Sequence, residues 1–168
     1  MNRHKLTDPA FIVPLGIFGV SLAALSVAYF SQYILKIEPC ALCLYQRIPY
    51  FASGLLGLVA LIISYRRIRV VEASGVIFGF GAAIALYHIG VEQHWWLSVT
   101  GCNASDVNSG IKTVKQLRES LLAGGSVMAC DKMNWSLFGF SMATYNFVAS
   151  LIFAVGAFWG AFKIGGHN

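Results

Sequence analysis

Charged residues are scarce in this chain of 168 residues. Asp, Glu, Lys and Arg make up 11% of it, whereas a soluble domain carries about 25%. Hydrophobic residues make up 57%, so most of the chain is expected to lie in lipid. The net charge of +5 does not indicate a nucleic-acid partner, because no basic run stands apart from the ends of the apolar segments.

The sequence also lacks internal repeats, low-complexity tracts and any flavin, haem or nucleotide-binding motif. Gly79 and Gly81 lie within an apolar run, which favours helix packing over a dinucleotide-binding loop. The length suits one domain. We therefore predict a single integral-membrane domain over residues 1–168, without a resident metal.

Four apolar segments are long enough to cross a bilayer, which takes roughly 20 helical residues. The first is too long for the apolar region of a typical signal peptide and is followed by three more, so it is expected to be retained. We predict an all-α membrane protein, a four-transmembrane-helix bundle. Its spans are placed at about 11–35, 43–65, 70–91 and 140–162, with loops at 36–42 and 92–139 on the non-cytoplasmic side.

The basic residues predict the orientation of this bundle. Three arginines, Arg66, Arg67 and Arg69, occupy the short connection between the second and third segments, whereas the first connection carries Lys36 offset by Glu38. Because Lys and Arg in short loops favour the cytoplasmic side, both termini are expected there. All four cysteines then lie on the other side, where disulfides persist.

Cys40 and Cys43 form a Cys-x-x-Cys pair at the entrance to the second segment. On a first helical turn their Cα atoms would be about 5–6 Å apart, within disulfide range. Pro39 suits a first helical position. The helix N-terminus, and Arg47 one turn further on, are both expected to favour a thiolate on Cys43.

Other interpretations of this pair remain open. A Cys-x-x-Cys motif can be half of a zinc site, with Cys102 and Cys130 completing the four ligands. It can also form an inert structural disulfide. Arg47 can extend its side chain to the interface, although an ionisable residue inside a span is a functional candidate by default.

The long loop carries Cys102 and Cys130. Apolar residues recur at helical spacing over 111–122, which predicts a short amphipathic helix on the membrane surface or packed against the rest of the loop. Gly124, Gly125 and Ser126 then form a flexible joint. That joint would allow Cys130 to approach Cys40.

Polar and aromatic residues gather where the third segment ends: His88, Glu92, His94, Trp95 and Trp96. The tryptophans are typical of an interfacial aromatic belt. His88 lies within the span, where it could donate a hydrogen bond to a ligand carbonyl or carry a proton.

Residues 39–47, Pro-Cys-Ala-Leu-Cys-Leu-Tyr-Gln-Arg, resemble the P-C-x-x-C-x-Y-[EQ]-R signature of the DsbB family, the quinone-dependent disulfide bond formation proteins. Cys102 and Cys130 match that family's second cysteine pair. The Cys130-Asp131 step, Trp135 and the segment 138–142 are also similar, so the resemblance covers essentially the whole chain.

The resemblance implies a catalytic relay through Cys102, Cys130, Cys40 and Cys43 in the bacterial inner membrane. A reduced periplasmic thioredoxin-fold oxidase, DsbA, would attack the Cys102–Cys130 disulfide at Cys102. Cys130 would then attack Cys40. Cys43 would pass electrons to ubiquinone or menaquinone, with Arg47 near the quinone ring.

Two other functions compete with this one. A membrane enzyme of the vitamin K epoxide reductase type reaches a similar site, but there the loop cysteines precede the Cys-x-x-Cys pair, whereas here they follow it. A non-enzymatic metal-binding or packing subunit would bind stoichiometric zinc with all four thiols reduced.

Overall fold

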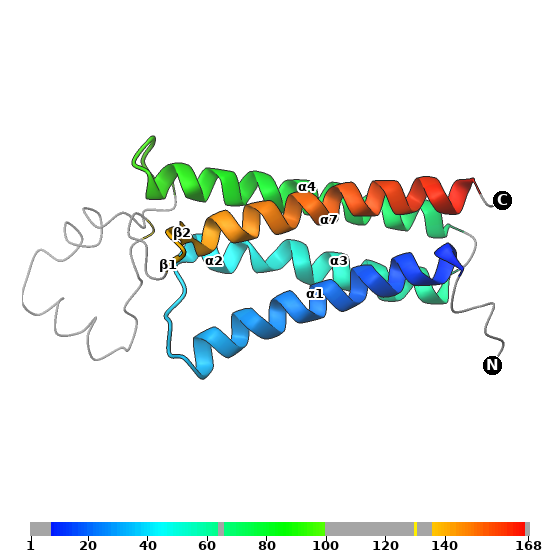
Figure 1. The fold of residues 1–168 in the computed structure, drawn as a ribbon, viewed down its shortest axis with the longest axis horizontal. Coiled ribbons are helices and arrows are strands. Elements are labelled where there is room, and N and C mark those ends of the chain that lie inside the picture. The colour runs from blue at the N-terminus through cyan, green and yellow to red at the C-terminus, as the bar shows by residue number, and fades with distance from the viewer. Residues whose placement is uncertain (1–7, 64–65, 100–129, 131–135, 167–168) are drawn as a thin grey trace, which may run out of the picture.

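The computed structural model describes residues 8–63, 66–99, 130 and 136–166. Within these ranges the protein is helical apart from one small hairpin (Figure 1). The helices are α1 (Pro9–Tyr33), α2 (Ala41–Tyr45), α3 (Arg47–Ile62), α4 (Arg67–Glu92) and α7 (Met142–Gly165), and the strands are β1 (Ser136–Leu137) and β2 (Phe140–Ser141). Cys102 and the predicted amphipathic helix lie outside the described residues.

Local chemistry accounts for the ends of the long helices. Asp8 caps α1 by accepting a hydrogen bond from the N–H of Ala10 at 2.9 Å, and Pro9 occupies the first turn. Ser141 caps α7 by accepting from the N–H of Thr144 at 3.3 Å. The hairpin before α7 turns through Phe138 and Gly139, both with positive φ, as a two-residue hairpin turn requires.

Three described helices are long and apolar enough to cross a membrane: α1, α4 and α7, with mean hydropathies of 2.2, 1.7 and 1.8. They correspond to the predicted spans at 11–35, 70–91 and 140–162. This supports the coarser prediction of an all-α, multi-pass membrane protein.

The predicted continuous span over 43–65 is interrupted. Gln46 ends α2 and precedes α3, which has 16 residues and is therefore about 24 Å long, less than the roughly 30 Å hydrocarbon core. Pro49 explains the break, because proline has no N–H to donate to the carbonyl of Tyr45 and its ring crowds that carbonyl.

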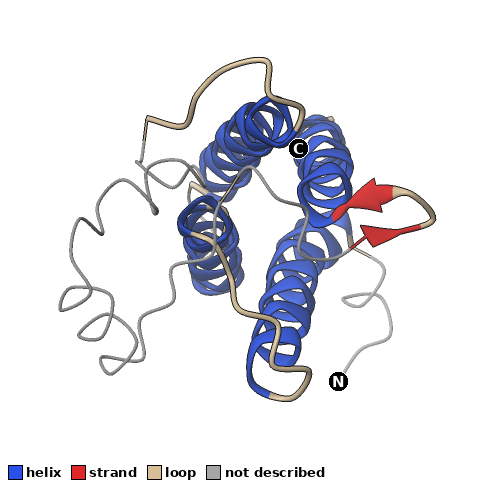
Figure 2. Cartoon of the chain, turned by 90° about the vertical axis from the view of Figure 1, so that its left-hand side faces the viewer, coloured by secondary structure: helices blue, strands red, loops and turns tan. Residues whose placement is uncertain are grey.

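Helix α3 packs between α1 and α4, and α4 packs along α7. Figure 2 shows the helices grouped around a common axis, seen from the end that carries α2 and the hairpin. The beginning of α1 and the end of α7 lie together at the opposite end (Figure 1).

Many small residues lie inside the bundle, together with a few large ones such as Phe78, and most large apolar residues lie outside. Ala60, Ala85 and Ala157 are buried, whereas Phe51 is 68% exposed and Phe162 is 78% exposed. Small residues let helices approach closely where lipid removes the hydrophobic drive for association. The distribution therefore suits a bundle whose outer surface meets lipid.

Candidate active site

The two cysteines of the Cys-x-x-Cys pair lie at the start of α2. Cys40 is the N-cap, and its Sγ accepts a hydrogen bond from the N–H of Cys43 at 3.3 Å. The two Sγ atoms are 2.9 Å apart, and both residues are free thiols. Pro39 therefore precedes the cap and does not occupy the predicted first helical position. The pair is placed for reversible disulfide formation.

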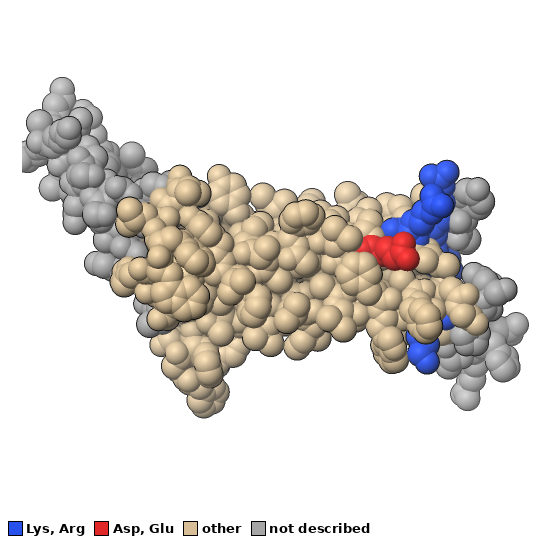
Figure 3. All heavy atoms as spheres, turned by 90° about the horizontal axis from the view of Figure 1, so that it is seen from above, with Lys and Arg blue, Asp and Glu red and all other residues tan. Residues whose placement is uncertain are grey.

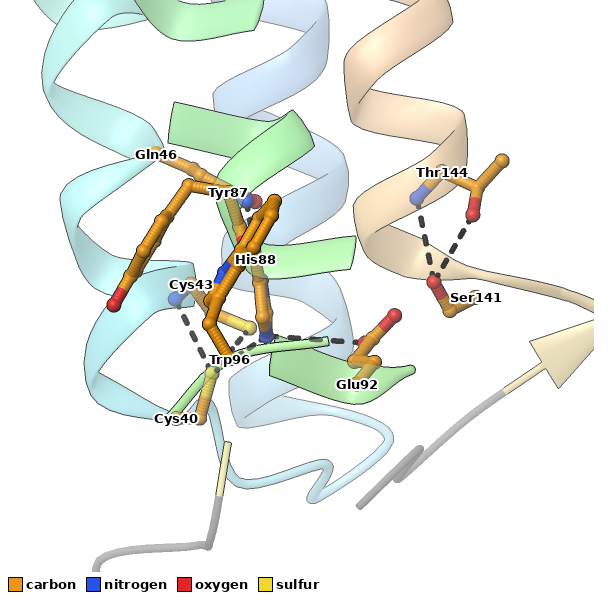
Figure 4. Close-up of polar contacts among 9 residues, drawn as sticks. All are labelled: Cys40, Cys43, Gln46, Tyr87, His88, Glu92, Trp96, Ser141 and Thr144. Carbon is orange, nitrogen blue, oxygen red and sulfur yellow. Dashed lines mark hydrogen bonds and ion pairs between the residues drawn. The ribbon is translucent and has the colours of Figure 1, made fainter. Parts of the chain in front are cut away.

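His88 reaches this pair from α4, a helix distant in the sequence (Figure 4). Its Nε2 lies 3.5 Å from the Sγ of Cys40 and 3.8 Å from Oε1 of Glu92. Its Nδ1 lies 3.1 Å from Nε2 of Gln46. His88 is 2% exposed, so the imidazole is a buried link between the cysteine pair and a carboxylate.

These contacts make Cys40 the stabilised thiolate. The hydrogen bond between the two sulfurs, together with the hydrogen bond and charge of His88, lowers the pKa of Cys40 from 9.0 to about 4, although burial acts in the opposite direction. The sequence-based expectation placed the thiolate on Cys43, whereas the contacts of this dithiol favour a thiolate on Cys40. Cys40 is the capping residue and lies beside the imidazole, whereas Cys43 is the third residue of α2.

Arg47 is turned toward α1. Its Nη1 donates to Oε1 of Gln32 at 2.6 Å, and its guanidinium lies 5.0 Å from the centre of the Tyr29 ring. Arg47 was expected to pair with a thiolate on Cys43. Its hydrogen bond instead joins α3 to Gln32 of α1. Arg47 still lines the same cavity as Cys43.

Cys130 lies in the same buried cluster as Cys40, together with Leu42 and Val91. It is 1% exposed and disulfide-bonded, and neither Cys40 nor Cys43 is its partner. The structure thus brings one loop cysteine to the Cys-x-x-Cys pair. The predicted position and role of Cys102 lie outside the described residues.

A cavity of about 480 Å³ opens beside the cysteines. Most of its wall is apolar and comes from α1, α3 and α7, including Ala24, Ala28 and Phe153. Polar groups converge at one end, where Cys40, Cys43, Gln46, Arg47, His88 and Glu92 line it. An apolar pocket with a few convergent polar groups is typical of a small-molecule site.

Several residues of this site make contacts that the sequence did not predict. Gln46 reaches His88, and Gln32 reaches Arg47. Tyr50 donates to Oδ1 of Asn146 at 2.6 Å beside the cavity. Gln46 occupies the [EQ] position of the cysteine signature, whereas the other pairings join helices distant in the sequence and leave no local signal.

The tryptophans after α4 are exposed, Trp95 to 64% and Trp96 to 43%. The Nε1 of Trp96 donates to the carbonyl of Tyr87 at 3.1 Å, and the two rings stack. This exposure agrees with the expected interfacial position. His94 is exposed and has positive φ.

Comparison with known proteins places this arrangement in a family. The family model described as "Disulfide bond formation protein DsbB" matches residues 11–160. The chain belongs to the DsbB family. Membership favours an oxidoreductase of disulfide formation over both the epoxide reductase type and a non-enzymatic subunit.

Individual relatives agree with this membership. The chain is 30% identical over 160 residues to disulfide bond formation protein B of Dechloromonas aromatica, covering 92% of this chain and 90% of that one. It is 25% identical over 165 residues to the protein of the same name from Stutzerimonas stutzeri, covering 92% and 96%. A probable disulfide formation protein C of Bacillus cereus is 34% identical over 102 residues, covering 60% and 69%. No solved structure matches.

Proposed function

We propose that this DsbB-family protein reoxidises a periplasmic DsbA-like thioredoxin-fold oxidase and passes the electrons to a membrane quinone. One observation carries the proposal: a thiol pair, buried Cys40 and half-buried Cys43, lines an apolar cavity while packing in one cluster with the disulfide-bonded Cys130. A disulfide relay needs a protein disulfide on one side of the pair and an electron acceptor on the other.

The relay balances as two disulfide exchanges. The partner's dithiol reduces the Cys102–Cys130 disulfide, and the partner leaves as a disulfide. Cys130 then attacks Cys40 of a Cys40–Cys43 disulfide, so that Cys43 is displaced. Cys102 next attacks Cys130, which restores the Cys102–Cys130 disulfide and leaves Cys40 and Cys43 as a dithiol. The two electrons and two protons of that dithiol would go to the quinone, which would restore the Cys40–Cys43 disulfide. The burial of Cys130 in one cluster with Cys40 supports Cys40 as the sulfur attacked.

The cavity suits a quinone headgroup. Its volume of about 480 Å³ falls within the range of about 300–1,000 Å³ for small-molecule sites. Arg47, Cys43 and His88 would hold the ring at the polar end, and the apolar wall would receive the isoprenoid chain. A bound ubiquinone or menaquinone supplies the capacity to accept two electrons and two protons.

The protein's own groups handle the protons. The imidazole of His88 lies between the Sγ of Cys40 and the carboxylate of Glu92, so it can take the thiol proton. Glu92 lines the cavity and can receive that proton from His88. The predicted role of His88 as a proton carrier thus has a donor and an acceptor within reach.

Charge placement supports a cytoplasmic location for both termini and a periplasmic location for the cysteines. Lys and Arg gather at the end of the bundle where α1 begins and α7 ends (Figure 3). Helix α2, which begins at the cysteine pair, lies at the opposite end (Figure 1). In a bacterial inner membrane, the positive-inside rule orients the arginine end toward the cytoplasm, with α2 and α3 together completing a fourth crossing.

The proposal is tested with purified protein, a reduced DsbA-like oxidase and a short-chain quinone. We expect steady quinone reduction by the wild-type protein and none above background in Cys43→Ser. The same variant should still form a mixed disulfide with the partner through Cys102, which shows that it is folded. Full quinone reduction by Cys43→Ser would refute the proposal.

Quinone specificity is read from the same assay. Ubiquinone and menaquinone analogues of equal chain length are compared, and their kcat/KM values show which quinone the cavity prefers. Ser98→Ala serves as a control substitution outside the cavity lining.

A further inference from the structure

The thiol pair and His88 form a cluster with the chemistry of a metal site. The two Sγ atoms and one ring nitrogen of His88 all lie within 4.8 Å of one another. Thiolate sulfur and imidazole nitrogen are the ligands that structural zinc sites use. The cluster is buried apart from Cys43, which is half-buried.

Glu92 provides a fourth ligand position. Its Oε1 lies 3.8 Å from Nε2 of His88, and its side chain is 7% exposed. Its Oε2 is buried without a hydrogen-bond partner among the residues that the structure describes. Burying a carboxylate oxygen without a hydrogen bond costs free energy. A cation bound by the cysteine sulfurs and His88 would give this oxygen a partner.

Gln46 supplies the outer contact that a metal-binding histidine needs. Its side-chain amide lies 3.1 Å from Nδ1 of His88. With the amide turned so that its oxygen accepts a hydrogen bond from Nδ1, the lone pair of Nε2 is directed to a metal. Nε2 is the nitrogen that faces both Cys40 and Glu92.

We propose that the reduced site binds one Zn²⁺ through Cys40, Cys43, His88 and Glu92, and that formation of the Cys40–Cys43 disulfide abolishes this binding. Binding displaces the remaining thiol protons and transfers no electrons. The sulfurs, now 2.9 Å apart, would separate to about 3.8 Å around a tetrahedral ion with Zn–S bonds of about 2.3 Å.

This inference goes beyond the proposed oxidation of a partner. A zinc ion on both thiolates would remove them from disulfide exchange, so the cation would inhibit the enzyme in its reduced state. A disulfide carries no thiolate charge and cannot hold the ion. The site is therefore a redox-gated zinc site.

The test uses the full chain with Cys102→Ser and Cys130→Ser, so that Cys40 and Cys43 are the only thiols. The protein is reduced, freed of reductant and titrated with Zn²⁺ against a chromogenic chelator. We expect one Zn²⁺ per chain. Co²⁺ should give d–d bands of tetrahedral intensity and a thiolate-to-cobalt charge-transfer band.

Matched variants assign the ligands. His88→Ala should weaken binding by about 100-fold or more, since loss of an outer-sphere contact alone costs about 10–100-fold. Glu92→Gln should weaken it by about 10-fold, because the amide oxygen is a poorer ligand. His94→Ala, an exposed histidine just beyond the end of α4, should leave the affinity unchanged.

Oxidation of the same chain controls for misfolding of the variants. Forming the Cys40–Cys43 disulfide should abolish zinc binding, and reduction should restore it. Absence of 1:1 binding in the reduced chain would overturn the proposal, as would equal binding by the oxidised chain. Neither result bears on the quinone assay, because this background lacks the loop cysteines that exchange with the partner.

Discussion

The two ends of the bundle are built on different principles. Where α1 begins and α7 ends, the helices approach closely through small residues: a Cβ on Gly57 would lie 2.9 Å from the backbone nitrogen of Phe18, and one on Gly160 would lie 2.6 Å from Val13. At the other end the helices surround a cavity lined by the cysteine pair, Arg47 and His88.

The difference shows how a membrane bundle can hold a reactive site. Close contact at one end holds the helices together through dispersion. At the cavity end, hydrogen bonds between side chains replace that contact, such as Arg47 to Gln32 and Tyr50 to Asn146. Substitutions at the cavity end should therefore change the pKa of Cys40 and the use of quinone. Substitutions at the packed end should change stability according to the side-chain volume that they add.

The largest effect expected at the polar end is on the thiolate of Cys40. With Cys102 and Cys130 replaced by serine and Cys43 retained, the ultraviolet absorbance of the thiolate should persist well below pH 9.0 and be lost only near pH 4. The sign follows because the folded protein lowers the pKa of an acid, so the charged form is retained as pH falls. A midpoint near pH 9 would contradict the contacts described.

His88→Ala sharpens this measurement. Removing the imidazole takes away both a hydrogen bond and a charge that stabilise the Cys40 thiolate, so the midpoint should rise. His94→Ala should leave it in place. If both variants shift the midpoint equally, the effect of His88 is not due to its contact with Cys40.

At the packed end, Gly57→Val should reduce stability by about 1–3 kcal/mol. The added Cβ would meet backbone atoms of α1, which cannot rotate away as a side chain can. Unfolding in mixed detergent micelles measures the loss. Gly156→Val is the matched control, since a Cβ at Gly156 meets nothing within 4 Å. Equal losses in the two variants would show that helix propensity, not close packing, is responsible.

Arg47→Ala should lower kcat/KM for a short-chain quinone by about tenfold, because a charge-assisted hydrogen bond contributes about 1.5–3 kcal/mol. Cys40 and Cys43 should still form their disulfide, as non-reducing peptide mapping would show. Arg69→Ala removes the same charge at the opposite end and should leave quinone use unchanged. An unaltered kcat/KM in Arg47→Ala would show that Arg47 only anchors its helix at the membrane interface and does not contribute to quinone use.

The smallest effect is expected for Tyr50→Phe. The hydroxyl donates to Asn146 at 2.6 Å and lies 3.0 Å from the Oγ of Ser150, so its loss should cost about 1 kcal/mol. Tyr33→Phe, at a 61% exposed position, should be neutral. Equal changes in the free energy of unfolding for the two variants would show that the buried hydrogen bonds of Tyr50 do not contribute to stability.

The long apolar helices were accessible from the sequence because each carries its signal within its own residues. Low charge and sustained hydropathy marked 11–35, 70–91 and 140–162, and the structure has helices there. The break at Gln46 was missed, since Gln46 and Arg47 alone do little to the mean hydropathy of a segment long enough to span a membrane. Pro49 was the available signal, acting on a carbonyl four residues earlier.

The sequence by itself determined that a Cys-x-x-Cys pair stands at the entrance to an apolar segment, and the signature around it identified the family. Both are local patterns along the chain. Tertiary structure alone decided which sulfur contacts an imidazole, because His88 comes from another helix and its Nε2 lies 3.5 Å from the Sγ of Cys40. It also turned Arg47 toward Gln32 and brought Cys130 into the cluster around Cys40, since such contacts depend on how helices pack.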